Sequence, residues 1–232
     1  MNEIQMKNLI LQDSISFPDI DLKGVKAVLI DLDDTLYFYQ PPHKKALHVL
    51  HEKISPICKM SYAEFEKQID DIWNDFCQEV DFSILIHNRM ATFQRFAEKN
   101  KVARPFVLAA RMKRIYFNAF MKAARLQGPA LQAKKFLDKC KKQKLPICLV
   151  TDMYTEIQVR KLRALKLLPY IDFIASNDEV GFDKPNSLMF KLALKKLNLK
   201  PKDVIMVGND LKRDIEGAEN LGILAYHVIV HK

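Results

Sequence analysis

Short apolar runs alternate with longer amphipathic stretches over the C-terminal half of the chain. The apolar runs are expected to be strands and comprise residues 145–151, 172–176, 203–208 and 223–230. The stretches around them have helical periodicity and comprise residues 129–143, 154–166, 185–197 and 212–221. Strands that alternate with helices form parallel sheets with right-handed crossovers. We therefore expect an α/β fold with a doubly wound parallel sheet.

A further apolar run at 25–31 precedes these elements and ends in a cluster of polar side chains. Only Lys26 interrupts the run, which is typical of a buried parallel strand. Ligands bind just outside the carboxyl ends of such strands, and unpaired carboxylates are costly there. The cluster therefore predicts a cation, and Mg²⁺ suits hard oxygen ligands. The alternative is an acidic turn that closes a strand. The cluster comprises Asp31, Asp33, Asp34 and Thr35.

Residues 37–127 differ from the rest, because helical periodicity dominates and glycine is absent. Ser61 and Glu64 have the spacing of a capping box, which opens a helix. We expect a helical domain at 37–127 inserted into a core domain formed by 1–36 and 128–232. The predicted helices of the insertion begin near 41, at Ser61, near 84 and near 104.

Charge is concentrated in this insertion. The chain of 232 residues has a formal net charge of +9, and residues 38–128 hold 15 Lys or Arg against 9 Asp or Glu. The excess indicates either a solvated helical surface or a positively charged lid over an anionic substrate. No block of Lys and Arg with interleaved aromatic residues occurs, so we expect no nucleic-acid partner.

Cysteine usage and hydropathy indicate a cytoplasmic protein. The four cysteines form no C-x-x-C pair and are expected to be reduced thiols. The N-terminal stretch lacks the apolar core of a signal peptide, and no run of 18 apolar residues is present. We therefore expect no membrane partner.

Each predicted strand is followed by residues that carry chemistry. Because the carboxyl ends of parallel strands share one edge of the sheet, these residues are expected to converge in one crevice. A set of acids, a hydroxyl group and an ammonium group can perform phosphoryl transfer through an aspartyl-phosphate. Beyond the first cluster, the set comprises Thr151, Asp152, Lys184, Asn209, Asp210 and Asp214.

In order and spacing, four motifs of the chain resemble those of the haloacid-dehalogenase-like (HAD) hydrolase superfamily. The insertion is similar to the C1-type helical cap of subclass I in that superfamily. The resemblance implies a Rossmann-like core and a Mg²⁺-dependent phosphatase. The four motifs are Asp31-Leu-Asp33-Asp34-Thr35-Leu36, Thr151, Lys184-Pro185, and Gly208-Asn209-Asp210 with Asp214.

The resemblance also implies a role for each residue. Asp31 is the expected nucleophile, and Asp33 is expected to protonate the leaving oxygen and later to take a proton from water. Such acid–base help is worth roughly 10²–10⁴-fold. Thr151, the backbone at Asp152 and Lys184 are expected to bind the phosphate oxygens, and Lys184 also neutralises charge on the nucleophile.

Mg²⁺ is expected to bind Asp31, the backbone carbonyl of Asp33 and one residue of the fourth motif. Family members often read Gly-Asp in this motif, with a second Asp four or five residues further. If Asp214 fixes the register, Asn209 occupies the usual position of the first Asp. We favour Asp210 as the direct ligand, with Asn209 and Asp214 as alternatives.

The favoured function is a Mg²⁺-dependent phosphatase that acts on a small phosphorylated metabolite of the nucleotide or sugar phosphate class. A phosphomutase would use the same centre and return the phosphoryl group. A haloacid dehalogenase would need neither the second Asp nor Mg²⁺. A binding module on the same scaffold could recognise acidic partners through the basic insertion.

Overall fold

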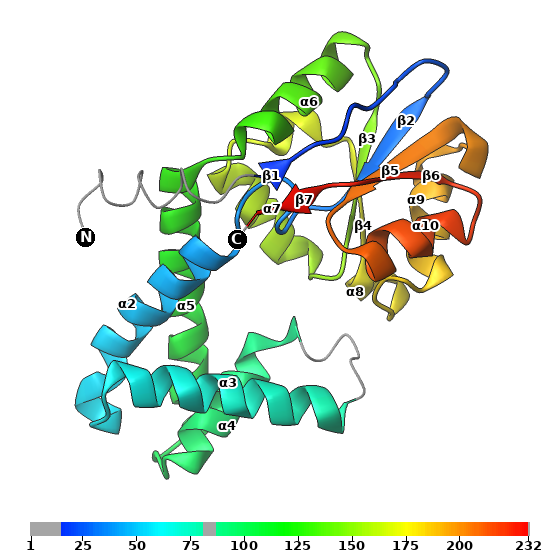
Figure 1. Ribbon diagram of the computed structural model, residues 1–232. Coiled ribbons are helices and arrows are strands. Elements are labelled where there is room, and N and C mark those ends of the chain that lie inside the picture. The colour runs from blue at the N-terminus through cyan, green and yellow to red at the C-terminus, as the bar shows by residue number, and fades with distance from the viewer. Residues whose placement is uncertain (1–14, 81–86, 232) are drawn as a thin grey trace. The chain divides into compact units, whose positions relative to one another are not determined.

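The structure is a computed structural model that describes residues 15–80 and 87–231 (Figure 1). The chain divides into two compact units. The core unit comprises 1–39 and 127–232, and the helical unit comprises 40–126.

The core unit contains a five-stranded sheet in which all neighbouring strands are parallel, as predicted. The order of the strands is β4-β3-β2-β5-β6. The strand of this sheet that comes first in the chain, β2, is therefore central. Its carboxyl end lies in the middle of the sheet edge. The strands are β2 (Ala27–Ile30), β3 (Ile147–Thr151), β4 (Phe173–Ser176), β5 (Val204–Gly208) and β6 (Leu224–His227).

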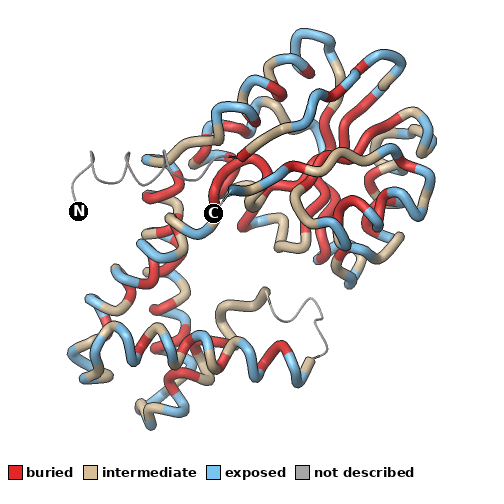
Figure 2. The backbone as a smooth tube through the Cα atoms, in the orientation of Figure 1, coloured by how far each residue is buried: buried red, intermediate tan, exposed pale blue. Residues whose placement is uncertain are grey.

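Helices cover both faces of this sheet, with α6 and α7 on one side and α9 and α10 on the other (Figure 1). Successive strand residues point to opposite faces, so Ala27 and Leu29 join one apolar cluster with Phe190 of α9. Burial is concentrated along these strands (Figure 2). The helices are α6 (Leu131–Lys142), α7 (Thr155–Ala164), α8 (Asn177–Val180), α9 (Ser187–Leu197) and α10 (Gly217–Glu219).

The end of the chain departs from the prediction of one strand at 223–230. That strand is divided: the backbone N–H of Val228 donates to Gly208 O and continues the pairing of β6 with β5 by one residue. The following β7 (Ile229–Val230) instead pairs antiparallel with β1 (Ile15–Ser16) in a separate sheet.

The helix predicted at 212–221 is also irregular. Its first part, Leu211–Glu216, is a wide helical turn of π geometry, and α10 adds one short turn. Asp214 within the wide turn is buried and contacts Lys184. Such π turns are often found at functional sites.

The helical unit contains the predicted helices. Ser61 and Glu64 form the predicted capping box: Glu64 N donates to Ser61 Oγ at 3.3 Å and Ser61 N to Glu64 Oε2 at 2.8 Å. The predicted helix start near 84 lies outside the described residues, and the helix there is described from Arg89. No helix in 15–80 or 87–231 has the length and apolar character needed to cross a membrane. The helices are α2 (Gln40–Cys58), α3 (Tyr62–Glu79), α4 (Arg89–Lys99) and α5 (Pro105–Gln127).

Candidate active site

Asp31 follows β2 directly and lies at the centre of the sheet edge. Its backbone N–H donates to Val207 O at 3.0 Å, which extends the ladder of β2 and β5 by one residue. The residue is only 8% exposed. Burial raises the pKa of Asp31 to about 7, against the opposing effect of the Lys184 ammonium. Ionised Asp31 therefore depends on cations close to its carboxylate.

Lys184 supplies one of these positive charges. The side chain is buried, and Nζ donates to Asp31 Oδ1 and Asp214 Oδ1, both at 2.7 Å, and to Val150 O at 3.0 Å. Burial alone would lower the pKa of Lys184, but the carboxylates of Asp214 and Asp31 hold it well above its usual value. Three acceptors match the three N–H groups of an ammonium. Two buried carboxylates thus share one cation.

Asp214 can reach Lys184 because the chain has no side chain at Gly208. A Cβ at Gly208 would overlap the carboxyl group of Asp214. The second oxygen of Asp214 accepts from Asp210 N at 3.1 Å, which fixes the wide turn. The glycine at the end of β5 is therefore required by a close approach rather than by its φ angle.

Thr35 lies between two oxygens that belong to different motifs. Its Oγ1 is 3.1 Å from Asp31 Oδ2 and 3.1 Å from Asn209 Oδ1. A hydroxyl group has a single hydrogen, so it can donate to one of these oxygens at a time. Asp31 Oδ2 and Asn209 Oδ1 are thus two hard oxygens that share one donor.

Asp210, the motif-four ligand favoured from the sequence, is engaged elsewhere. Its Oδ1 accepts from Lys212 N at 3.0 Å and from Arg213 N at 2.8 Å, which caps the wide turn. Its side chain is 44% exposed. The Thr35 hydroxyl thus links Asn209 to Asp31, whereas one oxygen of Asp210 caps the wide turn.

Thr151 and Asp152 follow β3 at the same edge. The Thr151 hydroxyl is buried and accepts from Gln158 Nε2. Asp152 Oδ1 accepts from Lys184 N at 2.7 Å, and burial raises the pKa of Asp152. The Asp152 carboxylate thus holds the backbone of Lys184.

Asp33 is held by three side chains. Lys161 Nζ donates to Asp33 Oδ1 at 2.8 Å and to Oδ2 at 2.6 Å. Tyr37 OH donates to Oδ1, and Gln158 Nε2 lies 3.3 Å from Oδ2. Burial alone would raise the pKa of Asp33, but the Lys161 ammonium and these hydrogen bonds hold it below its usual value.

Sequence reasoning missed Lys161, Gln158 and Tyr37. A signal was present in α7, where helical periodicity places Gln158 and Lys161 on the same stripe as the buried Ile157 and Leu162. Polar residues at positions that should be apolar indicate a buried partner.

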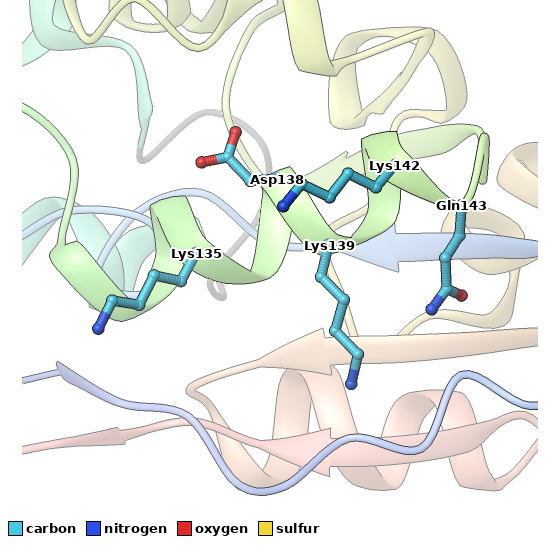
Figure 3. Close-up of a pocket in the computed structure, with 5 residues that line it drawn as sticks. All are labelled: Lys135, Asp138, Lys139, Lys142 and Gln143. Carbon is cyan, nitrogen blue, oxygen red and sulfur yellow. The ribbon is translucent and has the colours of Figure 1, made fainter.

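A surface pocket of about 370 Å³ is lined by other residues (Figure 3). All the side chains that line it belong to α6 or its end, and none of them is among the predicted site residues. The candidate active site is therefore described by the contacts among its residues at the sheet edge, and not by this pocket. The lining residues are Lys135, Asp138, Lys139, Lys142 and Gln143.

A sheet edge at which a buried lysine pairs with two buried aspartates is typical of one family of hydrolases. The family profile of haloacid dehalogenase-like hydrolases matches residues 25–222. This chain therefore belongs to the haloacid dehalogenase-like hydrolase family, which confirms the resemblance seen in the sequence.

Curated relatives agree with this assignment. The chain is 31% identical over 201 residues to ribulose-1,5-bisphosphate 5-phosphatase of Halopiger xanaduensis, covering 85% of this chain and 82% of that protein. It is 31% identical over 205 residues to glyceraldehyde 3-phosphate phosphatase of Methanothermobacter thermautotrophicus, covering 87% and 84%. The structure of 2-haloacid dehalogenase from Pseudomonas syringae matches with a TM-score of 0.69 at 20% identity, covering 87% and 85%. This last likeness shows the shared fold alone.

Proposed function

We propose that this protein is a Mg²⁺-dependent phosphatase that hydrolyses a small sugar phosphate through an aspartyl-phosphate on Asp31. The observation that carries the proposal is the buried Asp31 at the sheet edge, with one oxygen on Lys184 and the other on the hydroxyl of Thr35, which also contacts Asn209. The phosphatase relatives confirm the predicted class of enzyme, a phosphomonoester hydrolase of this family. Their sugar phosphate substrates favour that class over nucleotides.

The chemistry proceeds in two steps. In the first, a carboxylate oxygen of Asp31 attacks phosphorus and the bond to the leaving oxygen breaks. Asp33, which is ionised in the free enzyme, takes the proton of the monoanionic phosphate ester and passes it to that oxygen. In the second, water attacks the acyl-phosphate, Asp33 takes a proton from the water, and phosphate leaves with Asp31 restored. Lys184 neutralises Asp31 throughout, and Thr151 Oγ1 donates to a phosphate oxygen.

The donor set fits Mg²⁺. Asp31 Oδ2 and Asn209 Oδ1 share the one hydrogen of Thr35, and a cation bound between them would satisfy both. With the Asp33 carbonyl they would hold the ion, which shields the nucleophile from the phosphate and polarises the phosphoryl group. No group of three His, Cys, Asp or Glu side chains in the described parts of the chain could hold a metal ion. Mg²⁺ in proteins is commonly bound by one or two carboxylates and several waters.

A panel of phosphate esters tests the function. Phosphate release is expected from ribulose 1,5-bisphosphate, glyceraldehyde 3-phosphate or a related sugar phosphate, in preference to nucleoside monophosphates. EDTA should abolish the release and excess Mg²⁺ should restore it. Isomerisation of glucose 1-phosphate without hydrolysis would instead show a phosphomutase, and halide release from a 2-haloacid would show a dehalogenase. Tight binding of an acidic partner without turnover would show a binding module.

Two alanine variants distinguish the proposed metal ligand. Asn209→Ala should raise the Mg²⁺ concentration for half-maximal activity by about tenfold or more, because an oxygen ligand is lost. Asp210→Ala should change it by less than about threefold, since this residue is a helix cap. The Mg²⁺ concentration for half-maximal activity is measured for each variant by titrating phosphate release with Mg²⁺. A larger effect of Asp210→Ala than of Asn209→Ala would show that Asp210 is the ligand.

A further inference from the structure

Helix α7 carries two polar side chains on its buried face. Gln158 is 0% exposed and Lys161 is 1% exposed. A lysine is rarely buried to this extent unless its charge is paired. The partner of the Lys161 ammonium is Asp33, which lies 128 positions earlier in the chain.

Lys161 contacts both oxygens of Asp33, at 2.8 and 2.6 Å, and therefore fixes the plane of the carboxylate. The Tyr37 hydroxyl and Gln158 Nε2 donate to the same group. The ring of Tyr39 lies 5.5 Å from Lys161 Nζ and covers the ammonium. Because Lys161 is almost fully buried, we expect it to act through Asp33 rather than to touch a substrate.

Gln158 connects this group to the proposed phosphate-binding hydroxyl. Its two amide hydrogens point to Thr151 Oγ1 and to Asp33 Oδ2. Its Oε1 has no hydrogen-bond partner within the part of the chain that the structure describes. Since Thr151 Oγ1 accepts from Gln158, the hydrogen of the hydroxyl is left to donate to another oxygen.

We propose that Gln158 and Lys161 form a positioning pair on α7, which sets the orientation of Asp33 and of Thr151 together. This inference rests on the proposed phosphatase function. One helix then aligns the group that protonates the leaving oxygen with the hydroxyl that binds the phosphate. Misplacement of catalytic groups by small distances lowers rates strongly.

The leaving group provides the test. A sugar alkoxide leaves poorly without a proton, whereas p-nitrophenolate leaves readily without one. Lys161→Met keeps the length of the side chain and removes its donors. Its kcat on the sugar phosphate should fall by about 10²-fold or more, and that on p-nitrophenyl phosphate by less than about tenfold. KM should stay within about twofold on both substrates, since Lys161 touches neither.

Gln158→Leu is the second variant. It removes the whole amide group, including the unpaired Oε1, so no unpaired oxygen stays buried. It should show the same dependence on leaving group and should also raise KM for both esters, because Thr151 loses its orientation. It carries the test if Lys161→Met fails to fold. Lys191→Met on the exposed surface of α9 is the matched control and should behave as wild type.

Equal losses of kcat on the two esters would overturn the positioning role, because general damage to the fold has no preference for leaving group. Activity of both variants equal to wild type would also overturn it. If the wild-type protein hydrolyses neither ester, the proposed function itself fails, and the inference fails with it.

Discussion

Asp31→Asn is expected to abolish phosphate release, with a loss of roughly 10⁴-fold or more. The amide has nearly the shape of the carboxylate but cannot form the acyl-phosphate. An acid whose pKa is raised by folding destabilises the fold when ionised, and the pKa of Asp31 is raised to about 7. Removal of its charge should therefore cost little stability, and thermal unfolding should remain close to that of the wild type.

The matched control is Asp203→Asn, which makes the same change at the opposite end of the strands. Asp203 pairs with Lys26 at 2.9 Å just before β5 begins. This variant should retain full activity, because the pair is far from the carboxyl edge of the sheet. Phosphate release by Asp31→Asn at the rate of this control would show that Asp31 is not the nucleophile.

Lys184→Met should reduce both stability and activity. It leaves the carboxylates of Asp31 and Asp214 buried without their shared cation. The free energy of unfolding should fall by about 3–5 kcal/mol, as when one partner of a buried ion pair is removed. Phosphate release should fall by roughly 10²–10³-fold, because positive charge beside the nucleophile is lost. Urea unfolding and steady-state assays measure the two effects.

Two further variants separate these effects. Lys196→Met breaks an ion pair of equal length with Glu179, but that pair is partly exposed and should be worth about 0–1 kcal/mol. The double variant Lys184→Met/Asp214→Asn removes one of the two unpaired charges. It should recover part of the stability and none of the activity. An unfolding free energy of Lys184→Met within about 1 kcal/mol of wild type would contradict the buried-pair interpretation.

The alternation of apolar runs and amphipathic stretches was sufficient to predict the parallel sheet. The polar residues that follow each strand, such as Asp31 after β2, could also be predicted. Each motif spans only a few consecutive residues. The capping box at Ser61 is a contact over three residues, and it was predicted for the same reason.

Contacts between distant segments could not be predicted in this way. Asp210 was favoured as the metal ligand because it is the acid nearest to the family pattern. The structure shows two contacts that local spacing did not indicate: one oxygen of the Asp210 carboxylate is in a helix cap, and Asn209 contacts Thr35. The identity of the ligand stays a prediction. The division of the last strand likewise depends on the partner that β1 offers to β7.

The sequence by itself determined the class of fold and the position of Asp31 at the tip of the central strand. Periodicity and motif spacing depend on residues that are neighbours in the chain. Only the tertiary structure showed that Lys184 is shared by Asp31 and Asp214, and that Lys161 holds Asp33. These pairs join residues 30 to 153 positions apart, and packing of the helices against the sheet brings their buried charges together.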